Sequence, residues 1–166
     1  MLIKCQQSAE GGVIAGYNYH LAYVRDQYGV SRCLLKLGYH SEAKAILSYY
    51  LSVWKKFGHI SNAQAPGADG VFHIHENDRS EITGYLIVQA FDYYRRTGDD
   101  AFMEELFPML LWALDAQKSL LAGGMLPFNG DETYIAGGIL PRSAINDGSA
   151  EATLLFLTGG KQLLNY

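Results

Sequence analysis

The 166-residue sequence shows none of the features that would place it in a membrane or on a nucleic acid. No apolar run reaches the roughly 20 residues of a transmembrane helix. No basic segment precedes an apolar stretch near the start, so the sequence predicts neither a membrane span nor a signal peptide. The net charge of −4, with no basic stripe, disfavours nucleic acid as a partner.

Cysteine is also scarce. Cys5 and Cys33 are the only two, both fall in expected helices, and their spacing is not that of a metal site. Two thiols do not make a disulfide framework, and without a signal peptide this favours a cytoplasmic location. The sequence offers no convincing glycine-rich phosphate loop and no Ser-His-Asp signature, so we expect no cofactor.

Apolar and aromatic residues are plentiful, at 49% and 13% of the sequence. A chain of this length and composition can bury a sizeable core, which excludes a disordered protein and predicts a single domain over residues 1–166.

Helical periodicity predicts helices over residues 27–37, 41–57, 79–97, 100–121 and 149–157. Segment 79–97 is apolar on most sides and should be buried, whereas 41–57 and 100–121 each have one apolar face. Inner-type and outer-type helices therefore alternate. This alternation predicts an all-α fold of helical hairpins, of the α/α toroid or solenoid type.

Capping residues set the expected helix ends. Asp26 and Ser41 are the expected N-caps of the first two helices, and Asp78 with Glu81 resembles a capping box. Pro108 should kink its helix or begin a new turn. Three glycines about 60 residues apart should each end a repeating unit: Gly38, Gly98 and Gly159. A short helix before Gly11 and an extended piece over 70–74 complete the prediction.

Acid-containing clusters precede the inner-type helices. They are residues 25–26, 75–78, 131–132 and 146–147. In a stack of hairpins the inner helices run parallel, so their N-terminal ends share one face and would gather carboxylates, amides and aromatics there. Such a face suits a polar substrate. Helix N-termini also favour acidic residues without any ligand, because they carry partial positive charge.

Asp131 and Glu132 follow the turn 127–130 (PFNG) and precede Tyr134. Adjacent carboxyls near apolar rings can raise the pKa of one of them, which then keeps its proton near neutral pH. A general acid needs this property. The alternative is a turn with two solvated acids.

Arg25 and Asp26 follow Tyr19 and other aromatics. A carboxylate there can accept two hydroxyl hydrogen bonds from a sugar, and the arginine can position it. The alternative is an N-cap with an ion-paired neighbour. The twelve tyrosines could stack on sugar faces or fill the core.

Three further features stay open. His73 and His75 have a His-x-His spacing that zinc sites sometimes use, but structural or substrate-contacting roles are favoured and no metal is expected. Residues 146–148 (NDG) have turn chemistry. Glu151 could face the shared end of the helices or the solvent.

In order and spacing, four stretches resemble motifs of the six-hairpin glycosidases, most closely the glucoamylase-like group (glycoside hydrolase family 15 and relatives). They are residues 11–15 (GGVIA), 17–26 (YNYHLAYVRD), 37–43 (LGYHSEA) and 93–99 (YYRRTGD). The resemblance implies an (α/α)6 toroid that acts on α-linked glucosides or oligosaccharides. His20 departs from the pattern, since the family usually has an aromatic residue near this position.

The resemblance also implies residue roles. Arg25 and Asp26 match the pair that anchors the innermost sugar, and Glu132 falls where the family has its general acid. The sequence around Glu132 also resembles the GPDEY stretch of disaccharide phosphorylases. The glucoamylase-like family usually has Trp-Glu at its general acid, where this sequence has Asp131-Glu132. Further expected substrate-binding residues are Tyr19, Glu76, Asn77, Asp131, Tyr134, Arg142 and Asp147.

Six hairpins need roughly twice this length, so the resemblance implies a partial catalytic domain with about three hairpins and no identifiable catalytic base. Exposed inner-helix surface then predicts association, for example as a homodimer. The competing hypothesis is a helical-hairpin module that binds carbohydrate or protein without catalysis.

Overall fold

The computed structural model describes residues 2–68, 70–73, 78–128 and 145–166. Helices dominate it, which confirms the predicted all-α class, and no described helix is long and apolar enough to cross a membrane. The elements in chain order are α1 (Leu2–Cys5), β1 (Ala22–Tyr23), α2 (Val24–Lys36), α3 (His40–Phe57), β2 (Ala63–Gln64), β3 (Phe72–His73), the π-helical turn η1 (Asp78–Ile82), α4 (Thr83–Thr97), α5 (Asp100–Lys118), β4 (Leu126–Phe128), β5 (Ile145–Ser149) and α6 (Ala150–Leu164).

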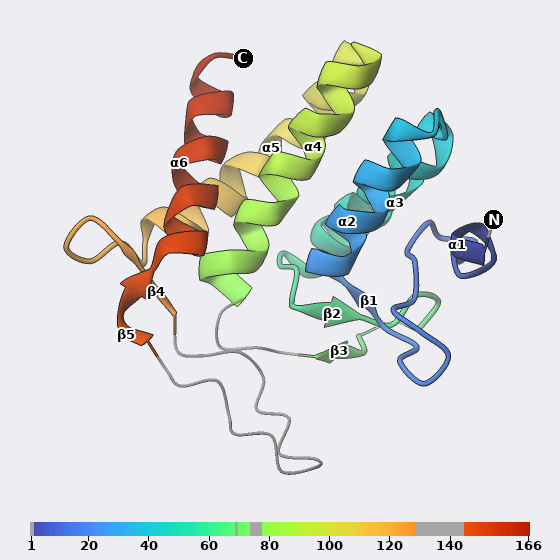
Figure 1. Ribbon diagram of the computed structural model, residues 1–166, viewed down its shortest axis with the longest axis horizontal. Coiled ribbons are helices and arrows are strands. Elements are labelled where there is room, and N and C mark those ends of the chain that lie inside the picture. The colour runs from blue at the N-terminus through green and yellow to red at the C-terminus, as the bar shows by residue number, and fades with distance from the viewer. Residues whose placement is uncertain (1, 69, 74–77, 129–144) are drawn as a thin grey trace.

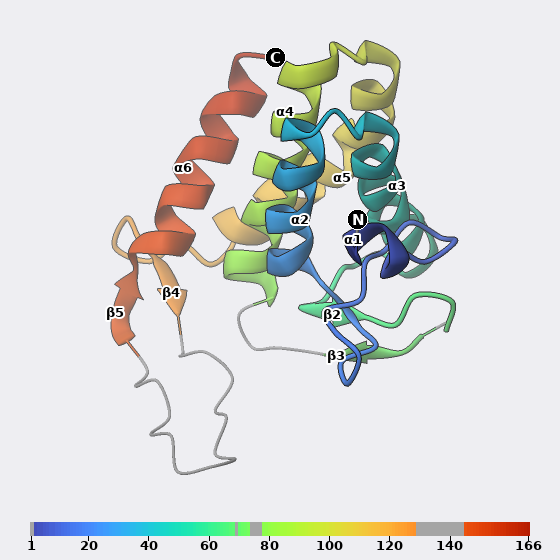
Figure 2. The same cartoon turned by 45° about the vertical axis from the view of Figure 1, so that its right-hand side comes forward.

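The long helices form two layers (Figures 1 and 2). One layer contains α2, α4 and α6, with α4 in contact with both neighbours, and the other contains α3 and α5. All residues of α4 from Thr83 to Phe91 are buried, as is Tyr93, which agrees with the apolar sequence of this helix. This arrangement agrees with the predicted alternation of inner helices (α2, α4, α6) and outer helices (α3, α5).

The three inner helices point the same way. In Figure 1 their N-terminal ends lie at the lower side of the helical layers, beside the short strands, and the turns from α2 to α3 and from α4 to α5 lie at the upper side. Arg25 and Asp26 on α2, Glu81 before α4 and Glu151 on α6 therefore lie toward one end, whereas the predicted clusters at 75–77 and 131–132 lie outside the described residues.

Two small antiparallel sheets border this end. In the first, Ala22 pairs with Gln64 and Ala63 pairs with His73; in the second, Leu126 pairs with Ser149. The sequence predicts only the piece around β3. Strands of two or three residues carry no usable periodicity. Residues 146–148, whose sequence has turn chemistry, lie within β5, where the register of pairing shifts between Ile145 and Ser149 and Gly148 has a φ of 112°.

The predicted N-caps of α2 and α3 are wrong. The helix α2 begins at Val24, whose N–H donates to the Asn62 carbonyl at 3.0 Å, so Asp26 lies in the first turn and is not the cap. The helix α3 begins at His40, one residue before the expected N-cap Ser41, and has no side-chain cap hydrogen bond. Backbone groups of neighbouring segments can satisfy helix ends that sequence patterns assign to side chains.

Side-chain capping differs between the start of α4 and the start of α5. No side chain caps α4, which continues from the π-helical turn η1 (Asp78–Ile82). The expected capping box stays a prediction, because the side chain of Asp78 is outside what the structure describes. Asp99 does cap α5, accepting from the Phe102 N–H at 3.2 Å. The helix α5 runs through Pro108 and ends at Lys118, earlier than predicted.

Gly159 does not end α6, which continues to Leu164. Gly38 and Gly98 do follow their helices with φ of 83° and 64°, as predicted. Gly159 instead lies against α4, where an added Cβ would be 3.0 Å from Cγ2 of Ile87. On α4, a Cβ on Gly84 would be 2.7 Å from Cβ of Leu155. Small residues on both helices therefore allow α4 and α6 to approach closely.

A pair of alanine substitutions tests this contact. Both Gly159→Ala and Gly160→Ala gain helix propensity, but Gly160 has only an ordinary contact, 3.6 Å to Leu114 Cδ1. We expect Gly159→Ala to be less stable than Gly160→Ala by about 1–3 kcal/mol, because its methyl overpacks the contact. Urea unfolding of both variants measures the difference, and equal stabilities would contradict the role given to Gly159.

Most of the interior is apolar and lies between the two layers. Cys5 and Cys33 are free thiols, as expected.

One side of α6 is exposed and apolar, with Leu154 and Leu157 61% and 59% exposed. A homodimer formed through this side of α6 stays a prediction.

Candidate functional site

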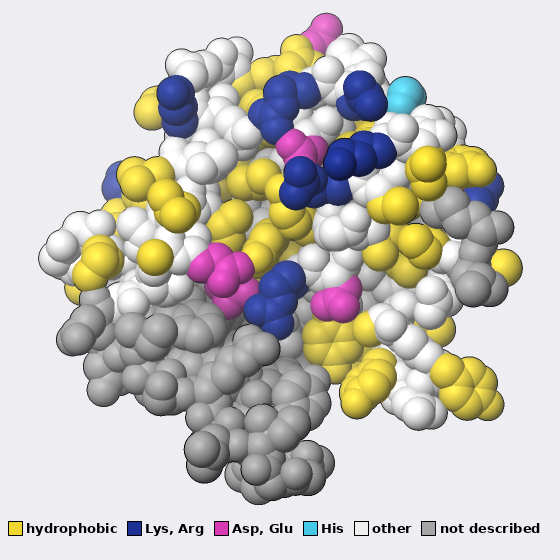
Figure 3. Space-filling model, in the orientation of Figure 1, with side chains coloured by type: hydrophobic (Ala, Val, Ile, Leu, Met, Phe, Trp, Pro, Cys, Tyr) yellow, Lys and Arg dark blue, Asp and Glu magenta, His cyan; other side chains and the backbone are white. Residues whose placement is uncertain are grey.

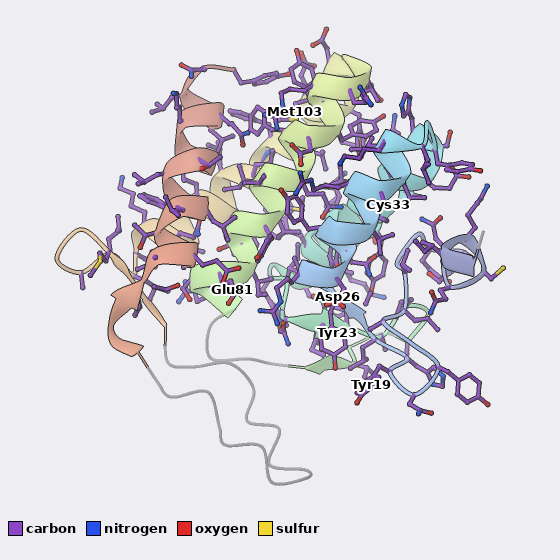
Figure 4. The ribbon with its side chains drawn as sticks, viewed as in Figure 1. Tyr19, Tyr23, Asp26, Cys33, Glu81 and Met103 are labelled. Carbon is purple, nitrogen blue, oxygen red and sulfur yellow. The ribbon has the colours of Figure 1, made fainter. Side chains whose placement is uncertain are left out.

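At the shared N-terminal end of the inner helices lie five polar or charged side chains, which come from α2, η1, α4 and α6. We call this group the mouth, and it consists of Arg25, Asp26, Glu81, Tyr85 and Glu151. Figure 3 shows acidic and basic side chains together where these helices begin, and Figure 4 labels Asp26 on α2 and Glu81 before α4. The mouth therefore combines residues that are far apart in the sequence.

An ion pair joins the first two inner helices at the mouth. The Arg25 Nη1 atom lies 3.1 Å from Glu81 Oε1 and donates a hydrogen bond to it. The side chain of Glu81 is only 5% exposed, whereas that of Arg25 is 45% exposed. The carboxylate is thus buried beside its partner, and much of the arginine faces the solvent.

A second pair joins α4 to α6. The Tyr85 hydroxyl donates to Glu151 Oε1, and the Tyr85 ring contacts Tyr28 of α2 with centroids 5.3 Å apart. Burial, and then the hydrogen bond to Glu151, raises the pKa of Tyr85 well above its usual range. Tyr85 therefore remains a protonated hydrogen-bond donor at neutral pH.

The loop before α2 carries the exposed aromatic residues of this end. Tyr19 is 53% exposed, and its position below α2 is labelled in Figure 4. The preceding segment is fixed by the buried side chain of Gln27, which accepts from the Val13 N–H at 2.8 Å and donates to the Val13 carbonyl. Gln27 follows Asp26 directly, so one helical turn both holds this segment and presents the Arg-Asp pair.

Several predicted site residues are beyond what the structure describes. Only Arg25, Asp26 and Tyr19 of the predicted set have described side chains, and all three lie at the same end of the molecule. The backbone of Asp147 belongs to β5, and its side chain is not described. Outside the described residues are Glu132, Glu76, Asn77, Asp131, Tyr134 and Arg142, together with His75 of the metal hypothesis.

Sequence reasoning missed three members of the mouth. It assigned Glu81 to a capping box, treated Tyr85 as core and left Glu151 undecided. A usable signal was present, because Glu81 and Glu151 each lie at the start of an inner helix, as Arg25 and Asp26 do. No group of three potential metal ligands occurs within the described part of the chain.

The comparisons with known proteins agree with a carbohydrate-active domain. Residues 1–133 match the family described as amylo-alpha-1,6-glucosidase. The chain belongs to this family. The predicted relation to glycoside hydrolases is thereby confirmed at the level of a glycosidase-related domain, but a specific relation to glucoamylase family 15 is not supported. No curated protein and no solved structure matches the chain significantly.

Proposed function

We propose that this domain binds an α-linked glucoside at the mouth and that Glu132 acts as the general acid that cleaves it. The observation that carries the binding part is the Arg25–Asp26 pair, exposed at the start of α2, with its arginine tied to the buried carboxylate of Glu81. The family name suggests an α-1,6-linked glucose unit as the substrate.

The chemistry of the mouth suits a neutral, hydroxyl-rich ligand. The Asp26 carboxylate can accept hydrogen bonds from two neighbouring hydroxyls, and the half-exposed guanidinium of Arg25 can donate to ring or hydroxyl oxygens. Charge-assisted hydrogen bonds of this kind fix the orientation of a sugar. The exposed ring of Tyr19 can stack on its apolar face.

Catalysis then requires two carboxyl groups. In our proposal Glu132 protonates the leaving glycosidic oxygen, and a second carboxylate activates water or attacks the sugar. The two groups are about 6.5–9.5 Å apart in inverting enzymes and about 5 Å apart in retaining ones. We propose that an (α/α)6 toroid, completed by further hairpins or by a second copy across the exposed side of α6, supplies the second carboxylate.

Asp26→Asn tests the binding part of the proposal. The substitution keeps the size of the side chain but removes the charge, and a hydrogen bond to a charged group is worth about 1.5–3 kcal/mol. We expect isomaltotriose to bind about 10- to 100-fold more weakly, as measured by isothermal titration calorimetry.

Asp115→Asn, at an exposed position of the outer helix α5, is the matched control and should bind like the wild type. Unchanged affinity in Asp26→Asn would remove Asp26 from the site. Tight binding without release of glucose would instead favour the non-catalytic carbohydrate-binding module.

A further inference from the structure

We propose that Glu81 is a positioning residue, which holds the Arg25 guanidinium in the orientation that receives the sugar. This inference rests on the proposed function, because it assigns a role within the same site. It adds a residue that does not itself touch the sugar.

The burial of Glu81 is the first observation. Its side chain is 5% exposed and lies in the π-helical turn η1, directly before α4. A buried carboxylate is costly unless a cation or hydrogen-bond donors compensate it. Arg25 supplies such compensation at 3.1 Å. Single π-helical turns are rare and occur frequently at functional sites.

The exposure of Arg25 is the second observation. A guanidinium has five N–H donors in a planar fork, so it can bind more than one partner at a time. The Arg25 side chain is 45% exposed, so it contacts Glu81 while a large part of its surface faces the solvent at the mouth. A long side chain that is held before binding loses less rotamer freedom when the ligand arrives.

The neighbouring pair is the third observation. Tyr85 donates to Glu151. Burial is the largest cause of the raised pKa of Tyr85, but the charges of Glu151 and Glu81 also raise this pKa and that of Arg25 lowers it, so these groups form one electrostatic cluster. The two carboxylates nevertheless have different partners, since Glu81 pairs with Arg25 and Glu151 with Tyr85. Glu81 is thus the carboxylate of this cluster that is placed to orient the arginine.

The alternative is that Glu81 only holds α2 against α4. A double-mutant cycle separates the two roles, because the effect of a positioning residue must disappear when the residue it positions is removed. The cycle uses Glu81→Gln, Arg25→Ala and the double variant, with isomaltotriose as the ligand and NMR titration for millimolar affinities. The Arg25 Nε–Hε signal reports the order of the side chain without any sugar.

We expect Glu81→Gln to weaken binding about 10-fold in the wild-type background and to have no effect on binding in Arg25→Ala. The Arg25 Nε–Hε signal should exchange faster with water in Glu81→Gln. The control, Glu105→Gln, removes a 2.9 Å ion pair to Lys55 between the outer helices and should change neither readout.

Wild-type affinity in Glu81→Gln, or the same loss in both backgrounds, would overturn the positioning role while leaving the proposed function intact. If the wild-type protein binds none of the α-1,6-linked sugars, the proposed function fails, and the role of Glu81 fails with it. The wild-type titration alone therefore distinguishes the two failures.

Discussion

Glu132→Gln should lower kcat on α-1,6-linked oligosaccharides by about 10²–10⁴-fold, because the amide cannot donate the proton that the leaving oxygen needs. The side chains are nearly the same size, so we expect the midpoint of thermal unfolding to stay unchanged. Glucose release by the full-length protein under saturating substrate measures the effect. The assignment of Glu132 rests on the sequence resemblance, since this residue lies outside the described part of the chain.

The matched control for this prediction is Glu104→Gln, an exposed glutamate on α5. It makes the same chemical change on an outer helix and should keep wild-type kcat. Near-wild-type turnover in Glu132→Gln would exclude this residue as the general acid.

Gln27→Leu should destabilise the protein by about 2–4 kcal/mol, because it leaves a buried backbone donor and a buried backbone acceptor without partners. Gln27 is fully buried and bonds both the N–H and the carbonyl of Val13, which is itself only 3% exposed. A loss of this size is a large fraction of the stability of a typical domain, which is about 5–15 kcal/mol. Urea denaturation followed by circular dichroism measures it.

Gln6→Leu is the control for Gln27→Leu, since it makes the same substitution in the N-terminal segment that Val13 belongs to. Gln6 is partly buried, and its backbone rather than its side chain bonds Ile14. A surface change of this kind should alter stability by no more than about 0.5 kcal/mol. Equal stabilities of the two variants would show that the bonds of Gln27 to Val13 do not hold this segment.

The sequence predicts the long helices well, because their apolar residues repeat with helical spacing over four or five turns. The stripe over residues 41–57 corresponds to α3, and the continuous apolar surface of 79–97 corresponds to the buried α4. The errors lie at helix ends. Gly159 has the sequence appearance of a stop, yet it is needed inside α6 because of Ile87 on α4, and no local pattern contains that contact.

The site was predictable only in part for a similar reason. Arg25 and Asp26 are adjacent and form a recognisable motif, so the sequence identifies them. Glu81 is 56 residues from Arg25, and its partner could not be inferred from a segment that also resembles a capping box. The π-helical turn that places Glu81 depends on tertiary packing and has no simple sequence signal.

An NMR titration of the wild-type protein with panose, which contains an α-1,6-linked glucose, tests the central claim most directly. Binding at the mouth predicts saturable shifts at Arg25, Asp26 and Tyr85, with none at Lys36 and Arg96 near the opposite ends of α2 and α4. Shifts confined to that opposite end, or no shifts at the mouth at saturating panose, would contradict the claim that this end of the inner helices is a glucoside site.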